Sequence, residues 1–204
     1  MNPWFRKLLG AAMGLSLAAA AWATTVIPPS FDQLVNESDF VVRAVVKTVT
    51  SEVRVSSTGS RKIYSKVELD VKEVVAGTPP ATVVLELLGG TVGSEAMWIE
   101  GAPRFNAGDE DILFVKGNGH TIYPLFAIMH GRYPILHESG TGRAYVARSD
   151  RSPLRAVSDV ALPLAEGAAA APVANAAASA LSPEEFTRQI KAAINPHYVA
   201  KALN

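Results

Sequence analysis

The sequence predicts an all-β domain, and three observations lead to this prediction. From Ile63 to Lys72, apolar or small side chains alternate with polar ones, and a period of two is typical of a strand with one face in a core. The segment 39–49 is dense in β-branched residues, and Ile112 to Val115 is an apolar run of buried-strand length. Seven or eight short extended segments with turns between them favour an antiparallel β-barrel or sandwich.

The remaining elements follow from local patterns. Ser30, with Gln33 three residues later, predicts a capping box and a short helix. Ser182 followed by Pro183 predicts the start of a second helix that runs to Ile194. This helix carries an apolar stripe of Phe186, Ile190 and Ile194. Such a stripe packs on its own domain more often than on a partner. Strands are expected at 39–49, 63–71, 82–88, 97–99, 112–115, 121–123, 132–137 and 143–147, with turns at 56–60, 77–80 and 117–119.

The first 23 residues predict a signal peptide rather than part of the fold. Arg6 and Lys7 precede an uncharged run of 14 residues, Leu8 to Ala21, whereas a membrane-spanning helix needs roughly 20. Ala21-Trp22-Ala23 supplies the small-x-small pattern of a cleavage site, so the mature chain is expected to begin at Thr24. An uncleaved membrane anchor is the alternative. We expect an exported protein, periplasmic or extracellular, with no stable membrane insertion after cleavage.

The mature chain is expected to divide into three parts. Residues 24–158 form the β-barrel with a C-terminal strand extension, 159–181 an Ala-rich linker, and 182–204 a C-terminal helix and tail. Eleven of the 21 residues from Ala161 to Leu181 are alanine, which leaves too few large side chains to build a core there.

Composition excludes several classes of function. Lysine plus arginine is 19 and aspartate plus glutamate is 19, so the chain lacks the basic excess of a general nucleic-acid binder. Because the chain has no cysteine, disulfide scaffolds, thiolate zinc sites and thiol nucleophiles are ruled out.

Catalytic and metal-binding motifs are not evident. Neither Gly-x-Ser-x-Gly nor His-Glu-x-x-His occurs, and there is no phosphate-binding glycine loop. His130 and His137 lie seven apart with a proline between them, so we interpret them as turn and strand-end residues rather than a metal pair. Asp109-Glu110-Asp111 lacks the alternating oxygen spacing of a calcium loop, and we expect a solvated entrance to the following strand. We therefore expect a non-enzymatic protein without a cofactor of its own.

One stretch resembles a known family. Thr24-Thr25-Val26-Ile27-Pro28-Pro29, followed by Asn36-Glu37-Ser38-Asp39-Phe40-Val41-Val42-Arg43-Ala44, resembles the N-terminus of the tissue inhibitors of metalloproteinases. Those proteins begin Cys-x-Cys-x-Pro-Pro and continue with Asn-x-Asp-hydrophobic-Val-hydrophobic-Arg-Ala. Segments 63–77 and 105–114 resemble later strands of the netrin-like domain to which the inhibitors belong. The resemblance covers residues 24–123 and implies an OB-type (netrin-like) antiparallel β-barrel of five strands with short flanking helices.

The resemblance also implies a mode of binding. In the family, the mature α-amine and first carbonyl chelate the zinc of the target protease, and the second side chain enters the adjacent pocket. By position, Thr24 would chelate that zinc in trans and Thr25 would enter the pocket, with Val26, Ile27, Pro28 and Pro29 completing the segment. An α-amine with a pKa of about 7.7–8.0 can bind zinc near neutral pH.

This sequence departs from the family at its cysteines. They fall on Thr24, Val26 and Asn36 here, so no disulfide clamps the N-terminal segment to the barrel. Pro28 and Pro29 restore some stiffness, because each fixes its own φ.

Two classes of function remain open. The first is a protein-binding module that presents its N-terminus to an exported zinc metalloprotease as an inhibitor. The second is an envelope or extracellular structural or interaction domain with no inhibitory role.

Overall fold

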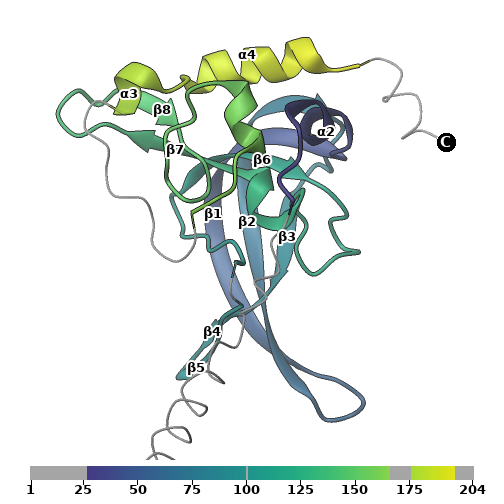
Figure 1. Cartoon of the computed structure of the whole chain (residues 1–204). Helices are drawn as coiled ribbons and strands as arrows, with labels where there is room; N and C mark the ends of the chain where they lie inside the picture. The colour runs from purple at the N-terminus through teal and green to yellow at the C-terminus, as the bar shows by residue number, and fades with distance from the viewer. Residues whose placement is uncertain (1–26, 100, 166–175, 196–204) are drawn as a thin grey trace, which may run out of the picture.

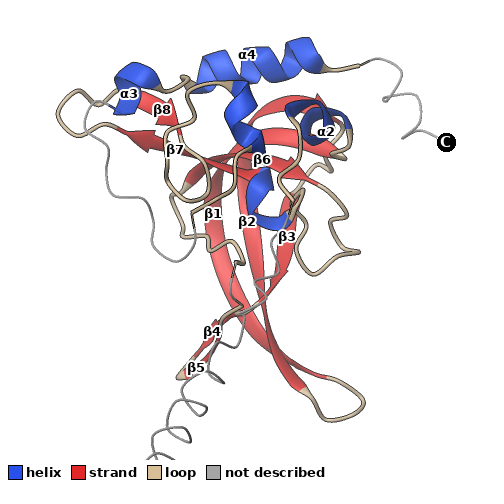
Figure 2. Ribbon diagram, in the orientation of Figure 1, coloured by secondary structure: helices blue, strands red, loops and turns tan. Residues whose placement is uncertain are grey.

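A computed structural model describes residues 27–99, 101–165 and 176–195 of the chain. Its main element is a six-stranded antiparallel sheet with strand order β3-β2-β1-β6-β7-β8, accompanied by a separate two-stranded sheet of β4 and β5 (Figures 1 and 2). The strands are β1 Phe40–Val55, β2 Arg61–Gly77, β3 Val83–Leu88, β4 Gly90–Val92, β5 Glu95–Met97, β6 Glu110–Val115, β7 Arg132–His137 and β8 Ala144–Val146. The prediction of a β-rich fold with short helices is confirmed. The described sheet is open, with β3 and β8 at its edges.

The helices are short, and α2 and α4 begin where the sequence predicts. They are α2 Phe31–Asn36, α3 Ala176–Ser179 and α4 Pro183–Ala193, with 3₁₀ turns at Ile128–Gly131 and Val157–Ala161. Ser30 and Gln33 form the expected capping box, and Ser182 caps α4 through the Glu185 amide. The two longer helices are joined directly, because the Asn36 side chain donates to the Ala193 carbonyl at 3.2 Å. In the predicted linker 159–181, Ala176 and Ala177 are buried, and residues 166–175 lie outside the described part of the chain.

β1 and β2 are longer than expected and form a hairpin arm that projects beyond the other strands (Figure 2). Pairing runs from Phe40 opposite Gly77 to Val55 opposite Arg61, and it shifts register three times in the first half of β1. Register shifts of this kind bend a strand and increase its twist. The arm ends in the predicted turn 56–60, closed by the Ser56 amide donating to the Ser60 carbonyl at 2.9 Å.

The sheet has a hydrophobic core on each face. The helix-side core contains Phe114 and Ile112 of β6, together with Phe186 and Ile190 of α4. The inner core lies on the opposite face; its members are Phe40, Val42, Ala44, Val46, Val67, Leu69, Val83, Leu85, Leu87, Phe105, Leu113, Val115 and Leu125. Because β6 contributes alternately to both cores, its run of apolar residues is continuous rather than alternating.

The C-terminal helix packs on its own domain, as predicted. Phe186 is completely buried, and its ring centroid lies 5.1 Å from that of Tyr133 and 6.2 Å from that of Phe114. Ile190 is also fully buried, and Ile194 packs at the margin of the same core.

Two strand predictions are wrong, that of 97–99 in part and that of 121–123 completely. β5 ends at Met97, so Trp98 and Ile99 lie outside it. Residues 121–123 form no strand, because Gly117 and Gly119 both have positive φ and the Thr121 amide turns back to the Gly117 carbonyl at 2.9 Å. The chain therefore makes a compact turn here instead of reversing into a ladder.

The assignment of buried and exposed faces in β2 can be tested by substituting two neighbouring residues. Val67 is 1% exposed in the inner core, so Val67→Asp places a carboxylate in apolar surroundings and is expected to unfold the domain. Lys66 points to solvent and makes an exposed ion pair with Glu52 at 3.4 Å, so Lys66→Asp should cost about 1 kcal/mol or less. Urea denaturation of both variants checks this, and equal losses of stability would contradict the assigned faces.

Candidate binding surface

The structure describes only part of the predicted N-terminal site. Ala21, Ala23, Thr24, Thr25 and Val26 lie outside the described residues. Ile27 is 86% exposed, whereas Pro28 is half-buried and Pro29 is buried.

The segment is anchored where it joins the fold. Immediately after Pro29, the Ser30 hydroxyl accepts from the Gln33 amide at 3.2 Å, and the Gln33 side chain accepts from the Ser30 amide at 3.0 Å. Leu34 in the same helix is completely buried. The point from which the predicted binding segment departs is therefore fixed by packing and capping.

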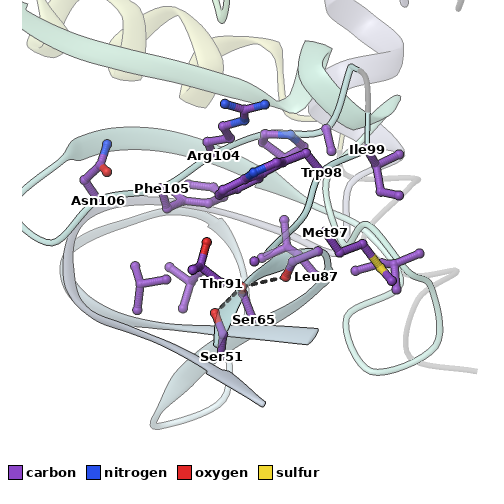
Figure 3. A pocket seen from close by; sticks show the side chains of 17 residues that line it. Ser51, Ser65, Leu87, Thr91, Met97, Trp98, Ile99, Arg104, Phe105 and Asn106 are labelled. Carbon is purple, nitrogen blue, oxygen red and sulfur yellow. Dashed lines mark hydrogen bonds between the residues drawn. The ribbon is translucent and has the colours of Figure 1, made fainter. Parts of the chain in front are cut away.

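The structure also contains a groove that the sequence did not indicate. It has a volume of about 380 Å³ and lies between the far end of the inner face of β1–β3 and the segment 97–106 (Figure 3). Its lining is predominantly apolar and consists of Val49, Ser51, Ser65, Val67, Leu87, Leu88, Gly89, Gly90, Thr91, Met97, Trp98, Ile99, Ala102, Pro103, Arg104, Phe105 and Asn106. The groove is thus the place where the inner core opens to solvent.

Small residues create the space on the sheet side of the groove. The Ser65 hydroxyl donates to the Gly89 carbonyl at 2.7 Å and lies 2.9 Å from the Ser51 hydroxyl. Since the only hydroxyl proton of Ser65 is engaged with Gly89, Ser51 donates to Ser65. A Cβ at Gly90 would clash with both serine hydroxyls, and this residue has a φ of +137°. Both conditions require glycine at this position.

The rim of the groove carries an aromatic ring and a positive charge. Trp98 is 54% exposed, and the Arg104 guanidinium carbon lies 4.4 Å from its ring centroid. Figure 3 shows these two side chains on one side of the groove, with Ser51 and Ser65 on the opposite side. Among the lining residues that the structure describes, which leave out residue 100, there is no carboxylate, and Arg104 makes no ion pair with any described residue.

Arg132 holds the rim segment against the sheet. Its guanidinium stacks on Phe105 at 4.2 Å from the ring centroid and donates to the Arg104 carbonyl. It also forms ion pairs with Asp111 at 2.8 Å and Asp109 at 3.0 Å. One side chain therefore connects β6, β7 and the loop that carries the rim.

The prediction of a solvated acidic entrance to β6 is wrong at Asp111, which is completely buried. Burial raises the pKa of Asp111, and the charge of Arg132 opposes this effect. Glu110 pairs with Arg43 at 2.8 Å, so each of the three carboxylates faces an arginine. Across the described ranges, no group of three His, Cys, Asp or Glu residues is arranged to hold a metal ion.

The two histidines of the sequence analysis lie in different surroundings. His137 is exposed at the end of β7, and His130 is buried in the 3₁₀ turn 128–131. Burial and the positive charge of Arg148 lower the pKa of His130, while Asp150 acts in the opposite direction. Arg148 and Asp150 are themselves buried and 3.8 Å apart.

Sequence reasoning missed the groove for an identifiable reason. In the sequence, Gly89-Gly90 directly follows the expected strand 82–88, and Met97-Trp98-Ile99 is expected as a strand of its own. A glycine pair followed by a large aromatic residue was the available signal, but nothing local shows that the two segments face each other.

Comparisons with known proteins leave the family open: no family model and no curated protein matches this chain. In the part of the chain that the structure describes, no helix combines the length and apolar character needed to cross a membrane.

Replacing Arg132 tests its role as the connector. Arg132→Met leaves Asp111 buried without its partner, and breaking a buried pair in this way costs about 3–5 kcal/mol. The free energy of unfolding from urea titration measures the loss. Arg155→Met removes an exposed arginine that takes part in no ion pair with the described residues, and it should leave stability within about 0.5 kcal/mol. Similar effects of the two changes would contradict the connecting role.

The buried His130 predicts a loss of stability in mild acid. Its pKa in the folded state lies below the ordinary 6.5, so below about pH 6.5 the unfolded chain binds more protons and stability falls as the pH falls. His130→Gln should flatten this dependence between pH 7.5 and 5, as measured by the urea midpoint, whatever its effect at pH 7.5. An unchanged slope in the variant would show that another group causes it.

Proposed function

We propose that this chain is an exported, non-enzymatic protein-binding module of netrin-like type that presents its N-terminal segment to a partner. The observation that carries the proposal is that the residues at the base of that segment are fixed by burial and helix capping. Ile27 is 86% exposed, while Pro29 is buried and Ser30 caps the following helix. A segment held in one conformation before binding loses less entropy when a partner engages it.

The proposed fold behind this function is a partly open barrel of OB type. β1 lies between β2 and β6, and β3 lies at the edge of the sheet. Two hydrogen bonds bridge the outer edge of β3 to the loop after β6. The Leu88 amide donates to the Ile122 carbonyl at 3.2 Å, and the Asn118 side chain donates to the Val84 carbonyl at 2.9 Å. These contacts support a sheet that curls toward closure around the inner core.

The more specific form of the proposal is inhibition of an exported zinc metalloprotease. The α-amine and carbonyl of Thr24 would chelate the partner's zinc, and the Thr25 side chain would enter the adjacent pocket. The family that the sequence resembles uses disulfides to hold this segment. In this chain, burial of Pro29 and the capped helix can take over that role.

The alternative is an envelope or extracellular interaction domain with no inhibitory role. The observation that favours it is the β1–β2 arm, which projects beyond the other strands (Figure 1). The arm carries Val55 near its tip with 62% of its surface exposed. This surface does not depend on the mature N-terminus.

Inhibition requires a free amine at Thr24, and an added residue tests this. One alanine ahead of Thr24, or acetylation of the Thr24 amine, should abolish inhibition of exported zinc proteases, because the chelate cannot form. Thr25→Gly should weaken inhibition without removing it, since only the pocket contact is lost. Inhibition constants and the N-terminal sequence of the secreted protein are the measurements.

Val55→Ser serves as the matched control on the arm and should leave inhibition unchanged. Melting temperatures should not move in any of these variants, because none of them alters the cores. Equal inhibition with and without the extra alanine, or none by either form, would reject inhibition. Loss of partner binding in Val55→Ser alone would favour the alternative.

A further inference from the structure

We propose that the groove between the β1–β3 face and the residues 97–99 and 102–106 binds a small amphipathic carboxylate, with its aliphatic chain in the groove and its carboxylate on Arg104. None of the described residues 27–29 lines this groove, and the inference does not depend on the proposed function. Pockets of roughly 300–1,000 Å³ that are mostly apolar with a few polar groups are typical of small-molecule sites. The volume of about 380 Å³ lies in this range.

The sheet side of the groove suits an aliphatic chain. Val67 and Leu87 are buried at 1% and 4% exposure, and Val49 continues the same apolar face toward the mouth. The hydroxyls of Ser51 and Ser65 already satisfy each other and the Gly89 carbonyl. An apolar chain can therefore cover them without leaving a donor unpaired.

Charge decides which end group the ligand carries. Of the lining residues that the structure describes, 97–99 and 102–106 on the rim and those on the sheet, Arg104 is the charged one and none is Asp or Glu. Its guanidinium stacks on Trp98, and stacking on one face leaves the in-plane N–H groups able to bind a carboxylate with two hydrogen bonds. From Arg104, a ligand with a positive head group would meet repulsion.

The site is formed before the ligand arrives. Arg132 fixes the rim through Phe105 and the Arg104 carbonyl, and it is itself held by Asp111 and Asp109. At about 30 Å³ for each water-sized group, the groove accommodates about twelve non-hydrogen atoms. This size corresponds to a medium-chain aliphatic acid rather than a long-chain lipid.

Three probes of equal chain length test the proposal by isothermal titration calorimetry on the full chain: octanoate, octan-1-ol and octylammonium. We expect saturable binding of octanoate, weaker binding of octan-1-ol and no binding of octylammonium. Arg104→Gln should weaken octanoate binding about tenfold, as expected for loss of a charge-assisted pair, and should leave octan-1-ol binding unchanged. Arg104→Glu should reverse the preference in favour of octylammonium.

Two further variants separate the groove from general effects of charge. Arg155→Gln removes an exposed guanidinium outside the groove lining and should leave octanoate binding unchanged. Trp98→Ala removes part of the rim and should weaken binding of both octanoate and octan-1-ol. Arg104, Trp98 and Arg155 are all exposed, so these variants are expected to fold, and thermal melting confirms it.

Several results would overturn the proposal. One is the absence of saturable octanoate binding at millimolar concentration. Another is a parallel loss of octanoate and octan-1-ol binding in Arg104→Gln, or an equal loss of octanoate binding in Arg155→Gln. The last test is sedimentation velocity of the chain without ligand. If the chain associates with itself and Trp98→Ala abolishes this association, the groove binds a second copy of the chain instead.

Discussion

The guanidinium of Arg132 connects parts of the chain that local structure leaves separate. It lies on β7, pairs with the completely buried Asp111 of β6, and holds the loop 104–109 through Asp109, Phe105 and the Arg104 carbonyl. A buried charge persists in a protein only when it is paired and hydrogen-bonded. The strand pair and the rim of the groove are therefore positioned by one electrostatic cluster, and the shape of the groove depends on it.

The bend of β1 is the second constraint. Val41 belongs to the helix-side core, while Val42, Ala44 and Val46 belong to the inner core. This is the ordinary alternation of a strand, and three register shifts against β2 bend it along its length. They let a single hairpin support the helices at one end, enclose the inner core in its middle and reach into solvent at its tip. The open end of the inner core, where Ser51 and Ser65 replace larger side chains, becomes the groove.

The two candidate surfaces use different chemistry. The N-terminal segment offers backbone groups and a free amine, and a buried proline and a capped helix hold its base. The groove offers apolar surface with one unpaired guanidinium among the described residues. A protein-binding role for the first and a small-ligand role for the second are compatible, because no described residue belongs to both.

Local pattern was enough to predict much of the fold. Alternation in 63–71, the apolar run 112–115, the Ser30 capping box and the Phe186 stripe each predicted the correct element, and the first and last of these also predicted the correct buried face. These features depend on residues close in sequence, since periodicity and capping act over a few positions.

Strand order, the length of the β1–β2 arm and the burial of Asp111 could not be predicted in this way. Each depends on contacts between distant segments. Asp111 looks solvated in sequence and becomes buried only because Arg132, 21 residues later, meets it across the sheet. The groove is the extreme case: Ser51, Gly90 and Trp98 carry no common sequence signal, and only the tertiary structure brings them together.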